Sequence, residues 1–222
     1  MLTSNNLICI TTGIPCNAIS ERRRANIVTN FAKHSIEVIF NEGITGKPSH
    51  VIMYTNIINM MRLYQSMEYT YAIICDDDFF IIPNFLEEIN NTVKLLPDNW
   101  RCLHLCPGYL WGRQFRDMSK VSHLNPEYNM EDADVPFDKS GRFYNNCDGK
   151  KYSDRSFWLG GPIAMLINKN NCESLLHDFC AEYDARPHNN DVVLTRILSG
   201  CDYVCREPML GYEEECGGTI FK

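Results

Sequence analysis

The chain has 222 residues, 45% hydrophobic and 22% charged, so it can form a sizeable core and is not mainly disordered. Its net charge of -7 and isoelectric point near 5.4 argue against a nucleic-acid-binding scaffold, which would normally present a basic surface. The N-terminus lacks the basic and long apolar regions of a signal peptide, and no apolar run is long enough to span a bilayer.

Short strand-like runs alternate with longer helical patterns along most of the chain. The expected strands are residues 7–11, 36–40, 69–75, 100–105, part of 157–168, and 202–205. The expected helices are residues 21–33 with Ser20 as N-cap, 49–65 with Ser49 as N-cap, 83–96 with Pro83 in first position, 171–183 and 191–198. This alternation predicts an α/β three-layer sandwich, in which a mostly parallel central sheet is flanked by helices.

We expect one domain over residues 1–222, with two halves at 1–105 and 106–222. Residues 107–156 are polar and rich in Asn, Asp, Gly and Lys, without a sustained period. A structureless stretch of this length is unusual inside a compact domain. We therefore expect some short elements and a functional loop there, with a disordered surface insertion as the alternative.

Cysteine usage favours a reducing compartment. The chain has eleven Cys, an odd number, and Cys9, Cys75 and Cys102 lie within apolar strand-like runs. Such residues are typical of buried, reduced thiols rather than of a disulfide framework. We therefore expect a cytoplasmic protein. Cys102 and Cys106 are spaced four apart, as are Cys201 and Cys205, which is not the paired CxxC spacing of a zinc site.

Three adjacent carboxylates, Asp76, Asp77 and Asp78, follow the expected strand at 69–75. Crowding them at the carboxyl end of a strand is costly unless a cation or hydrogen-bond donors compensate. In open α/β sheets, this edge is where ligands bind. Alternation along an extended segment would place Asp76 and Asp78 on one side, where they would hold Mn²⁺ or Mg²⁺, with Asp77 facing away. The alternative is a solvated acidic turn.

A second group of polar residues follows the first expected strand. Thr11, Thr12 and Gly13 end that strand, and a basic run at residues 22–24 begins shortly afterwards. An Arg from this run, for which we take Arg22, would reach a diphosphate through charge-assisted hydrogen bonds. The alternative is an ordinary strand–helix loop followed by a solvated basic face.

Two further motifs lie in the second half of the chain. Gly160 and Gly161 interrupt a strand pattern, which allows a ligand to approach the backbone closely or marks a simple bulge. Asn190 and Asp191 open the last expected helix. Asn190 would cap it, and Asp191 either favours its first turn or serves as a general base. His188 is a further candidate metal ligand or hydrogen-bond donor.

Taken in chain order, these motifs resemble the GT-A class of nucleotide-sugar-dependent glycosyltransferases over roughly residues 7–205. With no N-terminal membrane anchor, the chain looks more like a soluble bacterial enzyme or a capsid-glycosylating transferase of an algal virus. It departs from the class at Asn190, where a carboxylate is usual. It also lacks a His after Cys205 to serve as a further metal ligand, so His188 and water both remain candidates.

The resemblance implies transfer of a sugar from a UDP-sugar donor to a hydroxyl of a glycan or glycoprotein. Residues 1–105 would be the nucleotide-binding half and 106–222 the acceptor and sugar half. In this scheme Asp76 and Asp78 hold Mn²⁺ or Mg²⁺. The expected donor-binding residues are Thr11, Thr12, Gly13, Arg22, Asp76, Asp77, Gly160 and Gly161. Asp191 is the expected catalytic base if the reaction inverts the anomeric centre.

Two other functions are compatible with parts of this pattern. A sugar- or nucleotide-binding module of the same fold would bind without turnover, and the departure at Asn190 keeps that alternative open. A phosphatase of the haloacid-dehalogenase type would carry its DxD after the first strand, with Thr or Val two residues later. Here the motif follows the third strand and Phe80 takes that place, which disfavours the phosphatase.

Overall fold

The computed structural model describes residues 1–13, 18–105, 109–110, 113–114, 139–143, 157–158, 164–205 and 210–213. The strands of its central sheet are β1 (Leu7–Thr12), β2 (Glu37–Asn41), β3 (Tyr71–Cys75), β5 (Cys102–His104), β9 (Ala164–Asn168) and β10 (Asp202–Val204). They lie in the order β10-β5-β9-β3-β1-β2. All but β9 run parallel, and β9 lies antiparallel between β3 and β5. The expected mostly parallel sheet is therefore confirmed, apart from the direction of β9.

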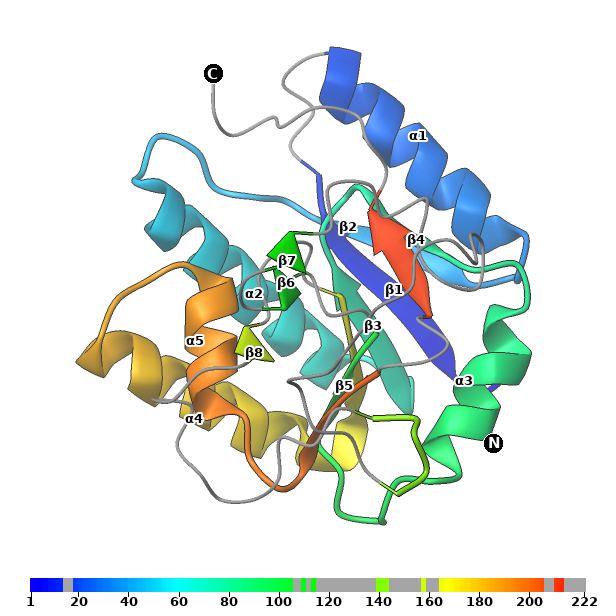
Figure 1. Cartoon of the computed structure of the whole chain (residues 1–222). Helices are drawn as coiled ribbons and strands as arrows, with labels where there is room; N and C mark the ends of the chain where they lie inside the picture. The colour runs from blue at the N-terminus through cyan, green and yellow to red at the C-terminus, as the bar shows by residue number, and fades with distance from the viewer. Residues whose placement is uncertain are drawn as a thin grey trace.

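Helices cover both faces of this sheet. They are α1 (Ala18–Ala32), α2 (Ser49–Ser66), α3 (Phe85–Val93), α4 (Cys172–Ala185) and α5 (Asn190–Ile197), with a short 3-10 turn at Lys169–Asn171. Figure 1 shows α1 and α3 on one side of the sheet and α2, α4 and α5 on the other. The three-layer α/β architecture predicted from the sequence is confirmed.

Several helices begin at different residues than expected. The helix α1 begins at Ala18, so Ser20 lies inside it and is buried rather than capping it. Pro48 is the N-cap of α2, which makes Ser49 its first helical residue. Asn84 is the N-cap of α3, so Pro83 precedes that helix instead of opening it. Each difference is a shift of one to three residues, because local capping signals do not settle where a helix begins.

The core is formed by strands that are apolar along their whole length. Leu7, Ile8, Cys9 and Ile10 of β1 are fully buried, as are the residues of β3 from Ala72 to Cys75. This continuous burial is expected where helices cover a parallel strand on both faces. Cys9 and Cys75 lie within these two strands. They are among the seven cysteines of the described residues, none of which is paired in a disulfide. The sequence predicted buried, reduced thiols at both positions.

The end of β9 fixes the carboxyl end of α2. Lys169 Nζ donates to the carbonyl oxygens of Tyr64, Gln65 and Met67, at distances of 2.7, 2.7 and 2.6 Å. These are carbonyls at the end of a helix, where a cation is favoured. At the other end of α2, Tyr54 stacks on Tyr183 of α4 with 3.5 Å between ring centroids. Contacts at both ends therefore hold α2 against neighbouring elements.

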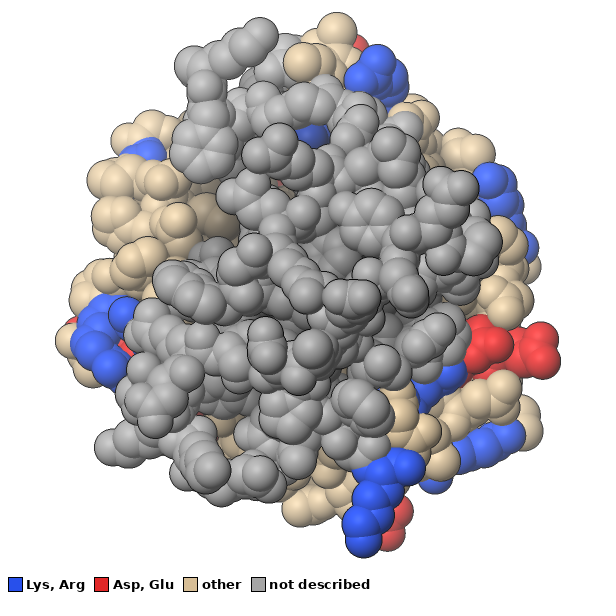
Figure 2. All heavy atoms as spheres, viewed as in Figure 1, with Lys and Arg blue, Asp and Glu red and all other residues tan. Residues whose placement is uncertain are grey.

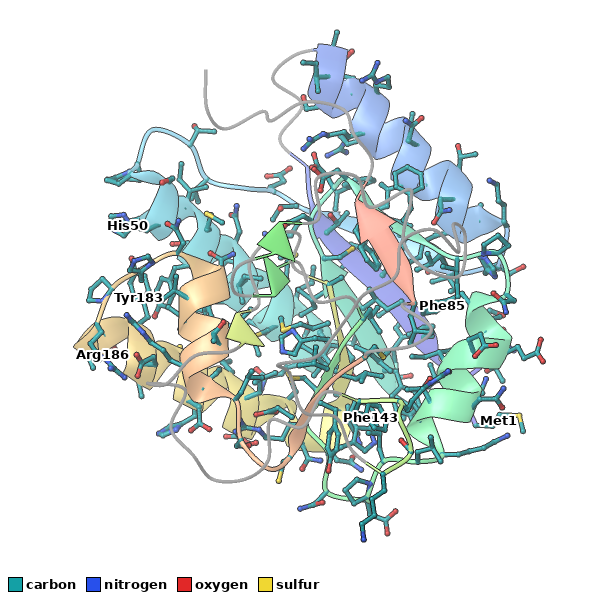
Figure 3. All side chains as sticks on the ribbon, viewed as in Figure 1. Met1, His50, Phe85, Phe143, Tyr183 and Arg186 are labelled. Carbon is teal, nitrogen blue, oxygen red and sulfur yellow. The ribbon has the colours of Figure 1, made fainter. Side chains whose placement is uncertain are left out.

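His50 extends this contact between the two helices. It lies beside Tyr183 near the start of α2, with 6.5 Å between ring centroids (Figure 3).

Burial is the main reason why the pKa of Tyr54 is raised. A neutral Tyr54 hydroxyl is therefore expected throughout the pH range in which the protein is studied.

Three smaller strand pairings lie outside the central sheet. The strand β4 (Phe79–Ile81) pairs antiparallel with β11 (Gly211–Glu213), and β6 (Tyr109–Leu110) pairs with both β7 (Arg113–Gln114) and β8 (Phe157–Trp158). The short elements expected within residues 107–156 are therefore present at β6 and β7. Most of that segment lies outside the described residues, including the part that we expected to act as a functional loop.

One described piece of this segment, residues 139–143, is anchored to the domain. Arg142 donates to Thr92 Oγ1 at 2.8 Å and pairs with Glu88 Oε2 at 2.8 Å, both on α3. The next residue, Phe143, is buried and packs edge-on against Tyr203 of β10 (Figure 3). An ion pair and a buried aromatic ring thus fix this piece to two elements of the domain.

Helix hydropathy and the charges on one face describe part of the surface. Among the described residues, no helix is both long and apolar enough to cross a membrane. Figure 2 shows basic and acidic side chains of described residues spread around the margin of one face, close to one another. On the described part of this face, the basic groups therefore do not gather into a single patch of the kind that binds nucleic acid.

A buried histidine occupies β5. His104 is 4% exposed, and its Nε2 lies 3.6 Å from Cys102 Sγ. Burial lowers the pKa of His104 to about 4, although the nearby carboxylate of Asp202 acts in the opposite direction. Asp202 is itself fully buried and accepts a 3.0 Å hydrogen bond from Arg101 Nε. His104 is therefore neutral in the folded protein at neutral pH.

We predict that this histidine makes folding stability depend on pH. An unfolded His titrates near 6.5 and His104 near 4, so the unfolded chain binds the extra proton first. The free energy of unfolding should then fall, by on the order of 3 kcal/mol, as pH decreases through this window. Urea unfolding should show a smaller fall for His104→Gln, whereas the exposed control His188→Gln should behave like the parent. Equal pH dependence in all three proteins would contradict this assignment.

Candidate functional site

Strand register brings the two sequence motifs of the first half together. Within the sheet, Thr11 lies opposite Cys75, and Thr12 lies opposite Asn41. Because β1, β2 and β3 are parallel, their carboxyl ends form one edge of the sheet. The Thr12–Gly13 segment and the three aspartates therefore lie at the same edge, as the sequence predicted. Thr11 is fully buried and Thr12 only partly, so Thr12 lies closer to the surface.

The three aspartates form a turn, not an extended segment. The backbone N–H of Phe79 donates to the carbonyl of Asp76 at 3.3 Å, and β4 begins immediately afterwards. The side chains of Asp77 and Asp78 both reach one guanidinium, that of Arg23 in α1. The expectation that Asp77 faces away from Asp78 is therefore wrong, because strand alternation ends at Cys75.

Arg23 forms a bridge between two carboxylates, and all three side chains are largely buried. Its Nη1 lies 3.2 Å from Asp77 Oδ1, and its Nη2 lies 2.8 Å from Asp78 Oδ2. The side chains of Arg23, Asp77 and Asp78 are 7%, 15% and 8% exposed. Burial raises the pKa of Asp77, and the proximity of Arg23 only partly opposes this. The Arg23 guanidinium therefore does not fully offset the effect of burial on the pKa of Asp77.

The neighbouring Arg24 contacts the ends of β1 and β2 at the same edge of the sheet. Its Nη1 donates to the carbonyl of Gly13 at 2.6 Å, and its guanidinium lies 3.8 Å from the centroid of the Phe40 ring. A Cβ on Gly13 would be 2.8 Å from Arg24 Nη1 and 2.9 Å from Phe40 Cδ1. A larger residue at this position would therefore force the Arg24 and Phe40 side chains to shift. In contrast, Arg22 is exposed on α1, and the structure brings Arg23 and Arg24 to the edge instead.

The sequence contained a signal for Arg23 that we had not used. The buried residues of α1 are spaced by three and four, which is the spacing of one helix face: Ser20, Arg23, Ile27, Asn30 and Phe31. An arginine on the buried face of a helix needs a buried partner. Arg22 lies about 100° around the helix, toward solvent. Counting the helical period from Ile27 and Phe31 would have selected Arg23.

Asn30, on the same face, fixes the strand that follows the aspartates. Its Nδ2 donates to the carbonyl of Ile81 at 3.2 Å, and its Oδ1 accepts from the N–H of Ile81 at 2.9 Å. On the other side of β4, Phe79 packs so closely on Gly211 of β11 that a Cβ there would lie 2.1 Å from the ring. The aspartate turn is therefore held between β3 and a firmly attached β4.

The carboxylates at this edge can be compared with the ligands that a divalent cation usually takes. Among the described residues, no three His, Cys, Asp or Glu side chains form a group able to hold a metal by themselves. Mg²⁺, however, usually keeps several waters and binds through one or two carboxylates together with substrate phosphates. Asp78 is at this edge with its Oδ2 2.8 Å from Arg23 Nη2, so the guanidinium lies between the carboxylates of Asp77 and Asp78.

The residues expected from the second half of the chain are only partly described. Gly160 and Gly161 lie outside the described residues. Asp191 is in the first turn of α5, but its side chain is outside the described part of the structure. In Figure 1, α5 begins toward the end of the sheet at which β1 ends. The backbone therefore places the start of α5 on the same side of the domain as the aspartates.

The start of α5 differs from the expectation that Asn190 caps this helix. Asn189, not Asn190, is the N-cap residue of α5, and it makes no side-chain capping bond. Asn190 is 3% exposed, and its Oδ1 has no hydrogen-bond partner within the described structure. His188 is exposed, and its Nδ1 accepts from the N–H of Asn189 at 2.9 Å. A role for His188 as metal ligand remains a prediction.

Comparison with known proteins relates the fold to solved structures. No protein-family model matches the sequence. No curated protein matches it either. A crystal structure of a glycosyltransferase involved in the glycosylation of the major capsid of PBCV-1 matches with a TM-score of 0.53 and 11% identity. That match covers 89% of this chain and 80% of the other.

A second structure, mouse xyloside xylosyltransferase 1 in its apo form, has a TM-score of 0.37 and 15% identity. The match covers 89% of this chain and 70% of the xylosyltransferase chain. Of these two structures, the PBCV-1 glycosyltransferase is the one with a TM-score above 0.5. The chain therefore has the mixed α/β fold of that glycosyltransferase over most of its length.

Proposed function

We propose that this protein is a metal-dependent glycosyltransferase that moves a sugar from a UDP-sugar donor to a hydroxyl of a glycan or glycoprotein. The observation that carries the proposal is the carboxylate turn at the carboxyl end of β3, with Arg23 and Arg24 beside it. The fold shared with a glycosyltransferase supports it further. UDP and the acceptor class come from the resemblance of the sequence motifs.

The described charges at this edge are compatible with a bound cation. Among the described residues, the three aspartates with Arg23 and Arg24 sum to a net charge of -1, and a nucleoside diphosphate is itself an anion. A cation between the carboxylates and the diphosphate would reduce their mutual repulsion. Bound Mn²⁺ or Mg²⁺ would act as a Lewis acid that stabilises the charge developing on the leaving diphosphate.

The chain's own residues have distinct roles in this proposal. Asp78 and Asp76 hold the cation, and Asp77 keeps Arg23 at the edge. Arg24 and the Thr12–Gly13 segment border the nucleotide, with the Arg24 guanidinium held against Phe40. Thr11, Gly160, Gly161 and Arg22 remain sequence predictions for donor binding. Asp191, at the start of α5, is the proposed base that removes the proton of the acceptor hydroxyl.

Nucleotide binding tests the proposal directly. With Mn²⁺ present, UDP at 100 times its dissociation constant should stabilise the protein by about 2.7 kcal/mol, which is visible as a higher melting temperature. The same panel includes GDP, CMP and ADP, each with and without Mn²⁺. Asp78→Asn should lose the shift caused by UDP with Mn²⁺, whereas Glu87→Gln, an exposed charge-matched control, should keep it. If no nucleotide raised the melting temperature, with or without Mn²⁺, the result would contradict the proposal.

The Asp78 variant should also be less stable on its own. We would have expected removal of a crowded carboxylate to relieve repulsion and leave the fold intact. The structure changes that expectation, because Asp78 is an ion-pair partner of the buried Arg23. Loss of one partner from a buried pair is destabilising, typically by about 3–5 kcal/mol, although Asp77 retains part of the interaction. The melting temperature of the variant without ligand is therefore its necessary reference.

Catalysis is tested separately from binding. Asp191→Asn should bind UDP with Mn²⁺ as the parent does, but should lose about 10²-fold or more in sugar transfer, since it lacks the proton acceptor. Release of UDP from UDP-sugars, with and without glycan acceptors, measures this. Asp184→Asn on the exposed surface of α4 is the matched control. Transfer at the parental rate would rule out Asp191 as base, and a parent without turnover would instead indicate a binding module.

A further inference from the structure

The bridge between Arg23, Asp77 and Asp78 is one of several contacts that attach α1 to the edge where β3 ends. The others do not involve the aspartate side chains. Asn30 makes two hydrogen bonds to Ile81 of β4, and Arg24 donates to Gly13 at the end of β1. The turn itself is closed by its own backbone hydrogen bond. The bridge differs from these contacts in that it places a buried positive charge directly against two carboxylates, at the edge where the proposed function places a cation.

The position of the guanidinium affects how a cation would bind at this edge. Arg23 Nη1 and Nη2 lie 3.2 and 2.8 Å from one oxygen of each carboxylate, and all three side chains are largely excluded from water. A divalent cation that binds Asp78 must share this carboxylate with a positive group that is already there. Like charges at such distances repel strongly where solvent screening is weak. In the free protein, Arg23 therefore competes with the metal.

A diphosphate removes this competition. Its oxygens offer the guanidinium charge-assisted hydrogen bonds that can replace those to the aspartates. With Arg23 on the diphosphate, its positive charge no longer opposes a cation at the carboxylates, and the cation in turn stabilises the bound anion. Metal and nucleotide would then each raise the affinity for the other by the same factor, as thermodynamic linkage requires.

We propose that Arg23 occupies the cation position between Asp77 and Asp78 in the free protein and transfers to the donor diphosphate on binding. The site consequently binds metal weakly alone and strongly together with a nucleoside diphosphate. This inference rests on the proposed function and adds an order to it: the metal is taken up with the donor rather than before it. Arg23 is therefore a coupling residue as well as a ligand of the diphosphate.

Titration of Mn²⁺ alone, by calorimetry or by the electron paramagnetic resonance signal of free Mn²⁺, tests the inference without an activity assay. Arg23→Gln should bind Mn²⁺ alone at least tenfold more tightly than the parent. The ratio of Mn²⁺ dissociation constants without and with UDP should fall at least tenfold. The control Arg62→Gln removes an exposed arginine from α2 and should match the parent in both measurements.

The outcomes separate this inference from the proposed function. A parent that binds neither Mn²⁺ nor UDP, alone or together, would overturn both. A parent that binds the two cooperatively, with an Arg23→Gln variant of equal or weaker affinity for Mn²⁺ alone, would overturn only the role of Arg23. That is the result expected if the bridge were purely structural.

A second variant covers the case in which Arg23→Gln does not fold. Arg23→Lys keeps the charge, but its single ammonium does not reproduce a planar bridge to two carboxylates. It should bind Mn²⁺ alone at least threefold more tightly than the parent and show reduced coupling to UDP. Unchanged affinity for Mn²⁺ alone in this variant would also overturn the inference.

Discussion

The structure of the candidate site depends on one electrostatic constraint: negative charge is concentrated where β3 leaves the core. Asp78 is nearly buried, and Asp77 is enclosed enough for its pKa to be raised. Such a turn is stable only with a positive group against it. In the free protein Arg23 supplies that group from α1. In the proposed function, a second cation would meet the same constraint when the anionic diphosphate binds.

Small residues and side-chain amides keep this arrangement in place. Gly13 and Gly211 each allow a contact that a Cβ would block, with Arg24 and Phe40 in one case and with Phe79 in the other. Asn30 satisfies both backbone groups of a residue in β4, which prevents that strand from moving away from α1. The site is therefore built on strand ends and one helix face, which hold charged groups more firmly than a loop would.

The parts of this molecule that follow local rules could be predicted from the sequence. The apolar runs of β1 and β3 identified buried parallel strands, and their parallel register brought Thr12 and the aspartates to one edge. Long-range and boundary effects escaped prediction. The pairing of β4 with β11 joins segments about 130 residues apart, and the reversed direction of β9 has no local signature. Asp77 was misplaced because a turn interrupts the alternation, and Arg22 was chosen over Arg23 without counting the helical period from the buried face of α1.

The central claim is that a divalent cation and a diphosphate meet at the carboxyl end of β3. Anomalous diffraction from crystals grown with Mn²⁺ and UDP measures this most directly, since the scattering of manganese locates the ion without reference to any assumed mechanism. The account predicts an anomalous peak within about 2.0–2.6 Å of a carboxylate oxygen of Asp78, in contact with the diphosphate. A peak elsewhere in the domain, or UDP bound at this edge with no metal beside it, would contradict the account.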